Sequence, residues 1–177
     1  MNWWFLTPCT YLVLLTGCVP NATVYYRPSV DGGKVVTAHC VPTQSNIDFQ
    51  VGSLPIRARA NEGQNGTIVS LTPSASSWKT FHFTTTNFAV RNLDSGVTIR
   101  NLLVRVMRHD KSDLITEPYH VQTEKGHYYW LDVYLPRPTP ENFEILSPSI
   151  MLDDKEFQFP PIRFERKVWV GISPFNC

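Results

Sequence analysis

Short runs of alternating apolar and polar residues constrain the fold of this chain more than any other feature. The two clearest runs are His127–Leu135 and Ile162–Ile172. Because side chains alternate across a strand with a period of two, both runs predict strands with one buried face. The predicted core sets are His127, Tyr129, Leu131, Val133 and Leu135 in the first run, and Ile162, Phe164, Val168, Val170 and Ile172, interrupted by Arg166, in the second.

Helical periodicity is missing by contrast, since no segment of about a dozen residues repeats its apolar positions every 3.6 residues. Fourteen prolines against nine glycines, with many Thr and Val, favour strands and turns. Eight or more short strands without helical crossovers predict an all-β fold, a single antiparallel β-sandwich of immunoglobulin-like or related Greek-key type. A length of 177 residues suits one such domain.

Turn residues separate the predicted strands. Asn65-Gly66 lies between two alternating runs and predicts a hairpin in which both residues have positive φ. Asp94-Ser95-Gly96 predicts another turn, and the broken alternation at Leu102-Leu103 predicts a bulge within a strand over Val97–Met107. The acidic clusters at 110–113 and 153–156 are interpreted as solvated turns, because a calcium site needs six to eight ligands.

The N-terminus has the pattern of an export signal. Residues 1–17 hold no charged side chain, and the apolar run Tyr11–Leu15 is followed by Leu15-Thr16-Gly17-Cys18, which is similar to the lipobox of bacterial lipoproteins. This predicts a signal peptide over 1–17, a lipidated N-terminus at Cys18 with a tether without regular structure up to residue 33, and the β-sandwich domain over 34–177. An ordinary cleaved signal with an incidental cysteine is the alternative. By analogy with enteric lipoproteins, Val19 favours the outer membrane, with the domain facing the periplasm.

Four cysteines occur, Cys9, Cys18, Cys40 and Cys177. Cys9 would leave with the signal and Cys18 would carry lipid, so two remain. In an oxidising compartment Cys40 and Cys177 are expected to pair, which would close almost the whole domain. Metal binding by Cys40 with His39 is the alternative, although two adjacent ligands and one remote thiol make a poor site.

Aromatic residues lie on the second face of the two clearest strands. Tyr128, Trp130, Asp132 and Tyr134 alternate with the core set of the first, and Arg163, Glu165, Lys167 and Trp169 with that of the second. If these strands pair, an aromatic and charged surface suited to a protein, peptide or glycan would face outward. The predicted contact residues are Tyr128, Trp130, Tyr134 and Trp169; a second buried layer is the alternative.

Other function classes find little support in the sequence. The formal net charge of +1 gives no reason to expect nucleic-acid binding. No phosphate-binding loop, nucleophile elbow or metal-ligand spacing occurs, so no cofactor, metal or catalytic residue is predicted. One rival hypothesis is an envelope hydrolase whose site is assembled from His120, His127 and Asp132. Another is a secreted domain without lipid, glycosylated at the sequons of Asn21 or Asn65.

Two blocks carry a family resemblance. The first runs from Tyr25-Tyr26-Arg27-Pro28 to His39-Cys40-Val41-Pro42, and the second from Phe159-Pro160-Pro161 to Asn176-Cys177. The chain resembles a group of uncharacterised proteobacterial lipoproteins with a lipobox, an early His-Cys-x-Pro and a terminal Asn-Cys. The resemblance implies pairing of Cys40 with Cys177 and brings no known activity. The expected function is therefore a membrane-anchored envelope lipoprotein that binds or scaffolds a partner without catalysis.

Overall fold

The computed structural model describes residues 20–38, 42–73, 80–108, 111–114, 120–122 and 129–172. Within these ranges the chain forms β-strands and turns and no helix, which confirms the predicted all-β class. The strands are β1 (Pro20–Ser29), β2 (Lys34–Val36), β3 (Asn46–Val51), β4 (Leu54–Gly63), β5 (Gly66–Pro73), β6 (Thr80–Phe83), β7 (Ala89–Asn92), β8 (Thr98–Arg100), β9 (Leu103–Arg108), β10 (Lys111–Leu114), β11 (His120–Gln122), β12 (Tyr129–Leu135), β13 (Asn142–Leu146), β14 (Ile150–Leu152), β15 (Lys155–Phe157) and β16 (Ile162–Ile172).

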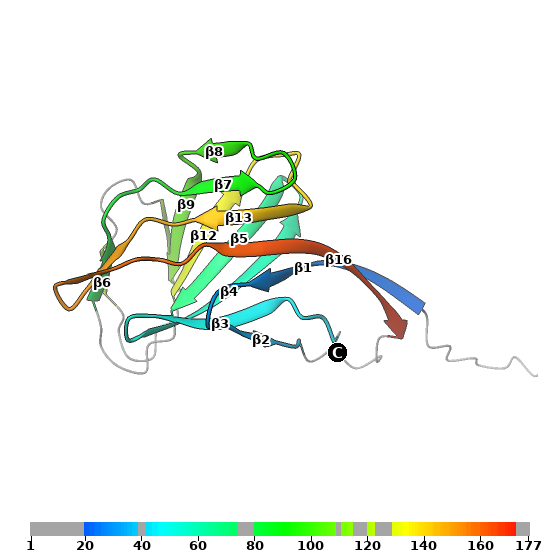
Figure 1. The fold of residues 1–177 in the computed structure, drawn as a ribbon, viewed down its shortest axis with the longest axis horizontal. Helices are drawn as coiled ribbons and strands as arrows, with labels where there is room; N and C mark the ends of the chain where they lie inside the picture. The colour runs from blue at the N-terminus through cyan, green and yellow to red at the C-terminus, as the bar shows by residue number, and fades with distance from the viewer. Residues whose placement is uncertain are drawn as a thin grey trace, which may run out of the picture.

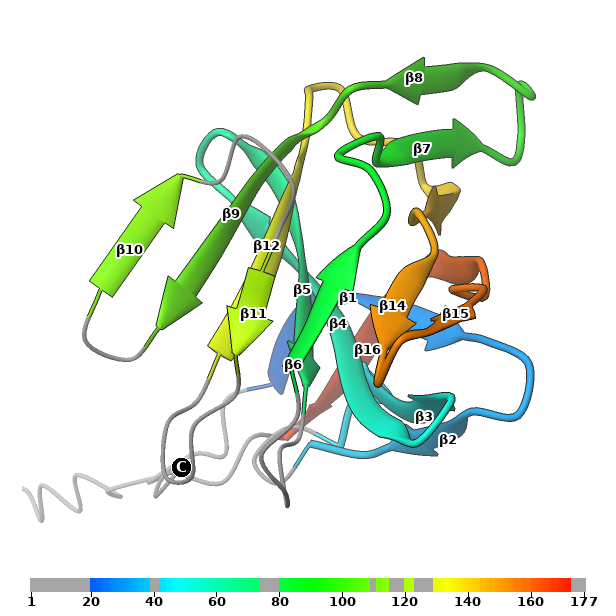
Figure 2. The ribbon, with the colours of Figure 1, turned by 90° about the vertical axis from the view of Figure 1, so that its left-hand side faces the viewer.

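Two large sheets form the predicted sandwich. The five-stranded sheet has the order β1-β16-β13-β7-β8, and the seven-stranded sheet has the order β10-β9-β12-β5-β4-β3-β2. A third sheet, β11-β6-β14-β15, lies at one end of the sandwich (Figures 1 and 2). All strand pairs described are antiparallel, so the predicted antiparallel β-sandwich is confirmed.

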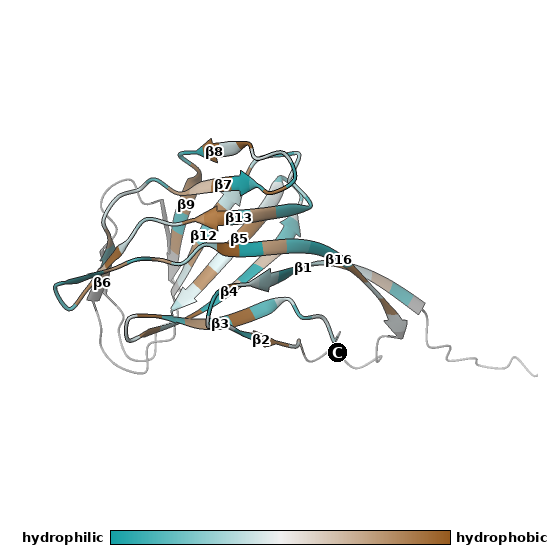
Figure 3. Ribbon diagram, viewed as in Figure 1, coloured by the Kyte–Doolittle hydropathy of each residue, from teal (hydrophilic) through white to brown (hydrophobic). Residues whose placement is uncertain are grey.

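Aromatic rings pack in the space between the two large sheets. Phe143 of β13 stacks on Phe164 of β16 with ring centroids 5.2 Å apart, and Tyr26 of β1 meets the edge of Phe143 at 5.3 Å. Leu131, Val133 and Leu135 of β12 are buried opposite them, as their alternation predicts. Hydrophobic and hydrophilic segments alternate along the strands of both sheets (Figure 3). The core is therefore built by period-two burial.

The prediction that residues 19–33 lack regular structure is wrong, because Pro20–Ser29 forms β1 and pairs along its whole length with β16. Pro20 and Pro28 suggest an irregular segment, because proline has no backbone N–H to donate to the hydrogen-bond ladder of a sheet. However, β1 is an edge strand, which needs only every second N–H. Pro20 and Pro28 are an even number of residues apart, so both missing donors fall on one edge.

The shared aromatic and charged surface depended on the condition that β12 and β16 pair, and this condition is not met, since they belong to different sheets. The core set of β16 is only half right. Ile162 and Phe164 are fully buried, whereas Val168 and Val170 are exposed. The reason is that β16 continues past the sandwich together with β1 (Figure 1). Arg166, which interrupts the apolar alternation, lies where the core ends.

The break at Leu102-Leu103 is larger than the predicted bulge. β8 belongs to the five-stranded sheet and β9 to the seven-stranded one, so the segment crosses from one sheet to the other. Asn101 lies at the crossing with a φ of 58°, in the left-handed region that asparagine tolerates. Leu102 is buried between the sheets while Leu103 is exposed.

The turn predicted at 110–113 is wrong, because Lys111–Leu114 forms β10 and pairs with β9. The other predicted turns occur, with one change of geometry. Asp94–Gly96 closes the β7–β8 hairpin, and Asp153 and Asp154 close β14–β15 with φ of 50° and 60°. The Asn65-Gly66 hairpin is present as β4–β5, but its pairing ends at Gly63 and Gly66. The two turn residues are thus Gln64 and Asn65. The predicted positive φ holds for Gly66, at 136°, and is wrong for Asn65.

Candidate functional site: the outer face of the seven-stranded sheet

The strand register brings an aromatic and basic cluster together on the solvent side of the seven-stranded sheet. Asp132 of β12 lies between Ser70 of β5 and Arg105 of β9. One step along β12, Tyr134 lies between Ile68 and Leu103 of the same two strands. We call the group Ile68, Ser70, Leu103, Arg105, Trp130, Asp132 and Tyr134 the β12 face.

Two contacts fix the polar groups of the β12 face. The Ser70 hydroxyl donates a hydrogen bond of 2.6 Å to Oδ1 of Asp132. Because Ser70 is buried, this bond satisfies a hydroxyl that would otherwise lack a partner and holds the carboxylate in one position. The Arg105 guanidinium lies over the Tyr134 ring, 5.3 Å from its centroid, in a cation–π contact. The ring and the guanidinium are therefore presented to solvent as one unit.

A bidentate ion pair lies on the same face of this sheet, on β3 and β4. Arg57 of β4 donates from Nε to Oδ1 of Asp48 at 2.7 Å and from Nη2 to Oδ2 at 2.8 Å. These hydrogen bonds lower the pKa of Asp48 below its usual range and raise the pKa of Arg57. Arg59, one pleat further along β4, lies opposite Ser70 and is exposed.

The structure brings some of the predicted contact residues together and separates others. Trp130 and Tyr134 share the β12 face and are half-buried. Trp169 lies on β16 in the other sheet, so it does not belong to this surface. Tyr128 lies outside the described residues, as do Cys18, Cys40 and Cys177.

The residues of the hydrolase hypothesis do not share one sheet. Asp132 lies in the seven-stranded sheet, whereas the backbone of His120 pairs with that of His82 between β11 and β6 of the third sheet. His127 lies outside the described residues. The hydrogen bond that Asp132 accepts comes from Ser70, its neighbour in the seven-stranded sheet.

Sequence reasoning missed Arg105, Ser70 and Ile68 as members of the surface. Each lies on a different strand from Trp130 and Tyr134, and only the pairing of β9, β12 and β5 makes them neighbours. A local signal existed for Arg105, because it alternates with the buried Val104 in a predicted strand. Nothing in the sequence around it points to Tyr134.

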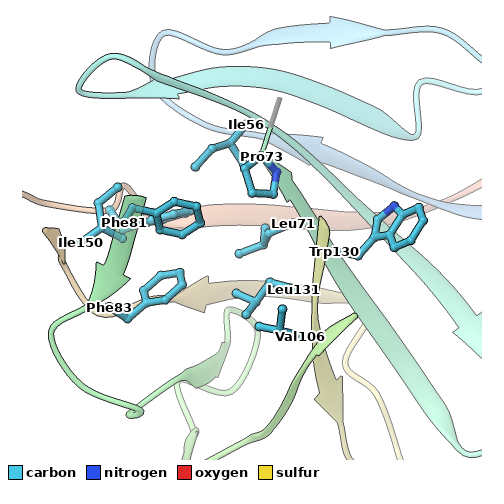
Figure 4. Close-up of a pocket in the computed structure, with 10 residues that line it drawn as sticks. Ile56, Leu71, Pro73, Phe81, Phe83, Val106, Trp130, Leu131 and Ile150 are labelled. Atoms are coloured by element: carbon cyan, nitrogen blue, oxygen red, sulfur yellow. The ribbon is translucent and has the colours of Figure 1, made fainter. Parts of the chain in front are cut away.

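An apolar cavity of about 20 Å³ lies between the third sheet and the seven-stranded sheet. Figure 4 shows Phe81 and Phe83 of β6, Ile150 of β14 and Leu71 of β5 turned toward it, with the Trp130 ring pointing away. Ligand pockets are usually ≈ 300–1,000 Å³, so this space is a packing void. Its apolar lining also offers a water molecule no hydrogen-bond partner.

A groove of about 400 Å³ opens beside the β4–β5 hairpin. Arg137, Arg166, Glu62 and Glu141 line it, so positive and negative groups balance. Arg137 donates a hydrogen bond of 2.7 Å to the carbonyl of Gly63 and thereby ties the hairpin to the β12–β13 connection. These contacts favour a structural role for the groove, in which Arg137 holds the hairpin in place.

Within the described ranges, no group of three or more His, Cys, Asp and Glu side chains is placed to hold a metal ion. The same ranges contain no helix with the length and hydropathy to cross a membrane. No family model, curated protein or solved structure matches the chain.

Proposed function

We propose that this protein is a lipid-anchored bacterial envelope protein that binds a partner through the β12 face and performs no catalysis of its own. The observation that carries the binding role is the grouping of half-buried Trp130 and Tyr134 with exposed Arg105 on one face of one sheet. Trp, Tyr and Arg are the residues enriched at the energetic centres of protein interfaces. A ring and a guanidinium held in place lose little side-chain entropy when a partner docks.

The chemistry of the β12 face favours a protein over a glycan. Ile68 and Leu103 add aliphatic area beside the aromatic residues, and Leu103 is among the large exposed hydrophobics. Arg59 and Arg105 are exposed basic groups on the same sheet surface. An apolar centre with arginines beside it suits a protein surface that presents apolar and acidic side chains.

The anchoring role rests on Leu15-Thr16-Gly17-Cys18 and on the start of the fold. β1 begins at Pro20, so a single residue, Val19, separates the proposed lipid site from the first strand. In this proposal the domain sits directly on the outer membrane, facing the periplasm. In the same proposal Cys40 and Cys177 form a disulfide, which is supported by the resemblance to the lipoprotein group at both cysteines.

Intact mass of the protein purified from membranes under non-reducing conditions tests the anchor. We expect an N-terminus at Cys18 that carries acyl mass, and two remaining thiols that do not react with iodoacetamide. A Cys18→Ser variant is the control and should lack the acyl mass. A soluble product cleaved elsewhere, with Cys18 unmodified, would contradict the lipoprotein proposal.

Site-specific photo-crosslinking in cells tests the binding face. A photoreactive phenylalanine analogue at position 134 should give a discrete crosslinked species that Arg105→Ala weakens. The matched control carries the same analogue at Thr98, an exposed position on β8 in the other sheet. Equal crosslinking at both positions, or none at position 134, would count against the β12 face.

A further inference from the structure

β1 and β16 continue beyond the body of the sandwich as a two-stranded arm. The arm consists of Pro20–Tyr25 paired with Lys167–Ile172, and its last pair is Pro20 with Ile172. Figure 1 shows both strands extending past the ends of their neighbours. β16 has lost its other partner by this point, because its pairing with β13 covers only Ile162–Glu165.

One face of the arm is apolar and uncovered. Val24 lies opposite Val168, and Ala22 lies opposite Val170, so the four side chains share one face. Val24 is 39% exposed and its partner Val168 is 58% exposed, and Val170, two residues nearer the tip, is 72% exposed. Large aliphatic side chains lined up in this way on a protruding ribbon need a partner that removes them from water.

The other face carries an aromatic side chain in a fixed position. The Trp169 ring lies over Gly171, where an added Cβ would come within 2.3 Å of Cζ2. Gly171 therefore allows the indole to lie flat along the strand toward the tip. Trp169 is half-buried by this contact and faces away from Val168 and Val170.

Charge is excluded from the outer part of the arm. Pro20–Val24 and Val168–Ile172 contain no ionisable side chain, and the next pair inward is Tyr25 with Lys167. An uncharged tip, a tryptophan and then a tyrosine–lysine pair is the order of residues found across a membrane interface. Indole and phenol rings sit at the headgroup level, while a lysine ammonium reaches the aqueous side.

We propose that the tip of this arm inserts into the headgroup region of the lipid bilayer as a second, non-covalent attachment. The inference rests on the proposed lipid at Cys18. Two residues of extended chain reach at most about 7 Å, so a lipid on Cys18 places Pro20, and with it Ile172, at the bilayer surface. The arm then fixes the orientation of the domain, which one flexible lipid linkage would leave free.

Insertion is limited to the interface. Within the part of the chain that the structure describes, β1 is an edge strand and β16 has no second neighbour in the arm, so both arm edges present backbone groups that no described strand pairs with. Such groups are costly in hydrocarbon but are satisfied by water and headgroups. The apolar side chains therefore enter to the depth of the headgroup and upper acyl region, about 5–10 Å.

Fluorescence of the lipidated protein in phosphatidylcholine vesicles tests the arm. Lipids brominated near the headgroup quench a tryptophan at that depth, and Trp169→Phe identifies the share of the signal that belongs to Trp169. We expect strong quenching that Trp169→Phe abolishes. Val168→Asp with Val170→Asp should remove most of the quenching while the protein remains on the vesicles through its lipid.

Val97→Asp is the matched control, because Val97 is 59% exposed in the β7–β8 turn and is thus as accessible as Val168. It should leave the quenching unchanged. Vesicle-bound protein whose Trp169 is not quenched would overturn the arm proposal and leave the lipid anchor intact. Protein without acyl mass that fails to bind vesicles would overturn the anchor, and the arm proposal with it. The protein could instead dimerise in detergent as its concentration rises. If Val168→Asp with Val170→Asp prevents that dimer, a second copy of the chain covers this face and the arm proposal is overturned.

Discussion

Arg91 of β7 and Arg163 of β16 hold Glu144 of β13 between them on the outer face of the five-stranded sheet. Glu144 is 1% exposed although the residues on both sides of it, Phe143 and Ile145, point into the core. Arg91 Nη2 contacts Oε1 of the carboxylate, and Arg163 Nε lies 3.6 Å from Oε2. The two arginines cover the carboxylate as well as neutralising it.

We expect Arg91→Met to lower the free energy of unfolding more than Arg163→Met, because Arg91 is the less exposed of the two arginines. Removing one partner leaves a buried charge with less compensation, which costs about 3–5 kcal/mol in fully buried pairs. Since both arginines are partly exposed, about 1–3 kcal/mol is expected for Arg91→Met. Urea denaturation of both variants measures the difference; an equal loss would show that Arg91 and Arg163 act only as cover.

The ion pair of Asp48 and Arg57 predicts a small dependence of stability on pH. The hydrogen bonds from Arg57 lower the folded-state pKa of Asp48, so their stabilisation is present above the unfolded pKa and is lost as the pH falls through the folded one. At pH 7, Asp48→Asn should reduce stability by about 0.2–1 kcal/mol, since both side chains are exposed. The difference from wild type should shrink as the pH falls below the ordinary pKa of aspartate and vanish once Asp48 is protonated in the folded protein. A difference that persists there would assign the effect to packing.

Two glycines at positive φ should respond differently to alanine. A Cβ on Gly66 would lie 2.3 Å from the carbonyl oxygen of Leu135, while nothing lies within 4 Å of one on Gly96. Gly96→Ala should cost about 1 kcal/mol, the strain of a left-handed conformation. Gly66→Ala adds a backbone clash and should cost more than about 3 kcal/mol. Thermal denaturation of the pair compares them directly, and similar losses would contradict the close approach to β12.

Phe83 connects the third sheet to the sandwich core. Its ring lies 5.1 Å from that of Phe88 and 6.1 Å from those of Phe81 and Phe159. Phe83→Ala should cost about 3–5 kcal/mol, because it enlarges the apolar cavity that Phe83 already lines. Phe83→Leu, which keeps most of the volume, should lose much less. Benzene should restore part of the stability of Phe83→Ala, and no response to benzene would indicate that the site collapses.

The aspartates of the β14–β15 turn offer a stabilising change. Asp153 and Asp154 both have φ in the left-handed region, where asparagine and glycine fit better. Asp153→Asn with Asp154→Gly should raise the melting temperature, with a gain of about 0.5–1 kcal/mol. Loss of stability would show that the two carboxylates make contributions that outweigh the backbone strain.

Local patterns in the sequence were sufficient for the strands whose neighbours lie on both sides within the sandwich. β12 is an example, since Leu131, Val133 and Leu135 are buried as their alternation predicts. The hairpin turns at Asp94–Gly96 and at Asp153-Asp154 were equally readable, because turn chemistry is a property of a few adjacent residues.

The pairing of strands that are distant in the sequence could not be predicted from local patterns. Nothing near β16 shows that its partners are β1 and β13, which lie at very different distances along the chain. An alternating strand looks the same whether its apolar face meets a second sheet or projects past it. For this reason the alternation predicts Val168 and Val170 in the core, where they are not, and it leaves open whether Trp169 and Trp130 share a surface.

The pairing of Pro20 with Ile172 also determines how the domain responds to mechanical load. The two chain directions leave the fold from the same end of one antiparallel ladder. Tension applied between them therefore loads the hydrogen bonds of that ladder one after another, as in unzipping, and does not shear them all together. A pull through the chain ends would peel β1 from β16 first, before the force reaches the aromatic core.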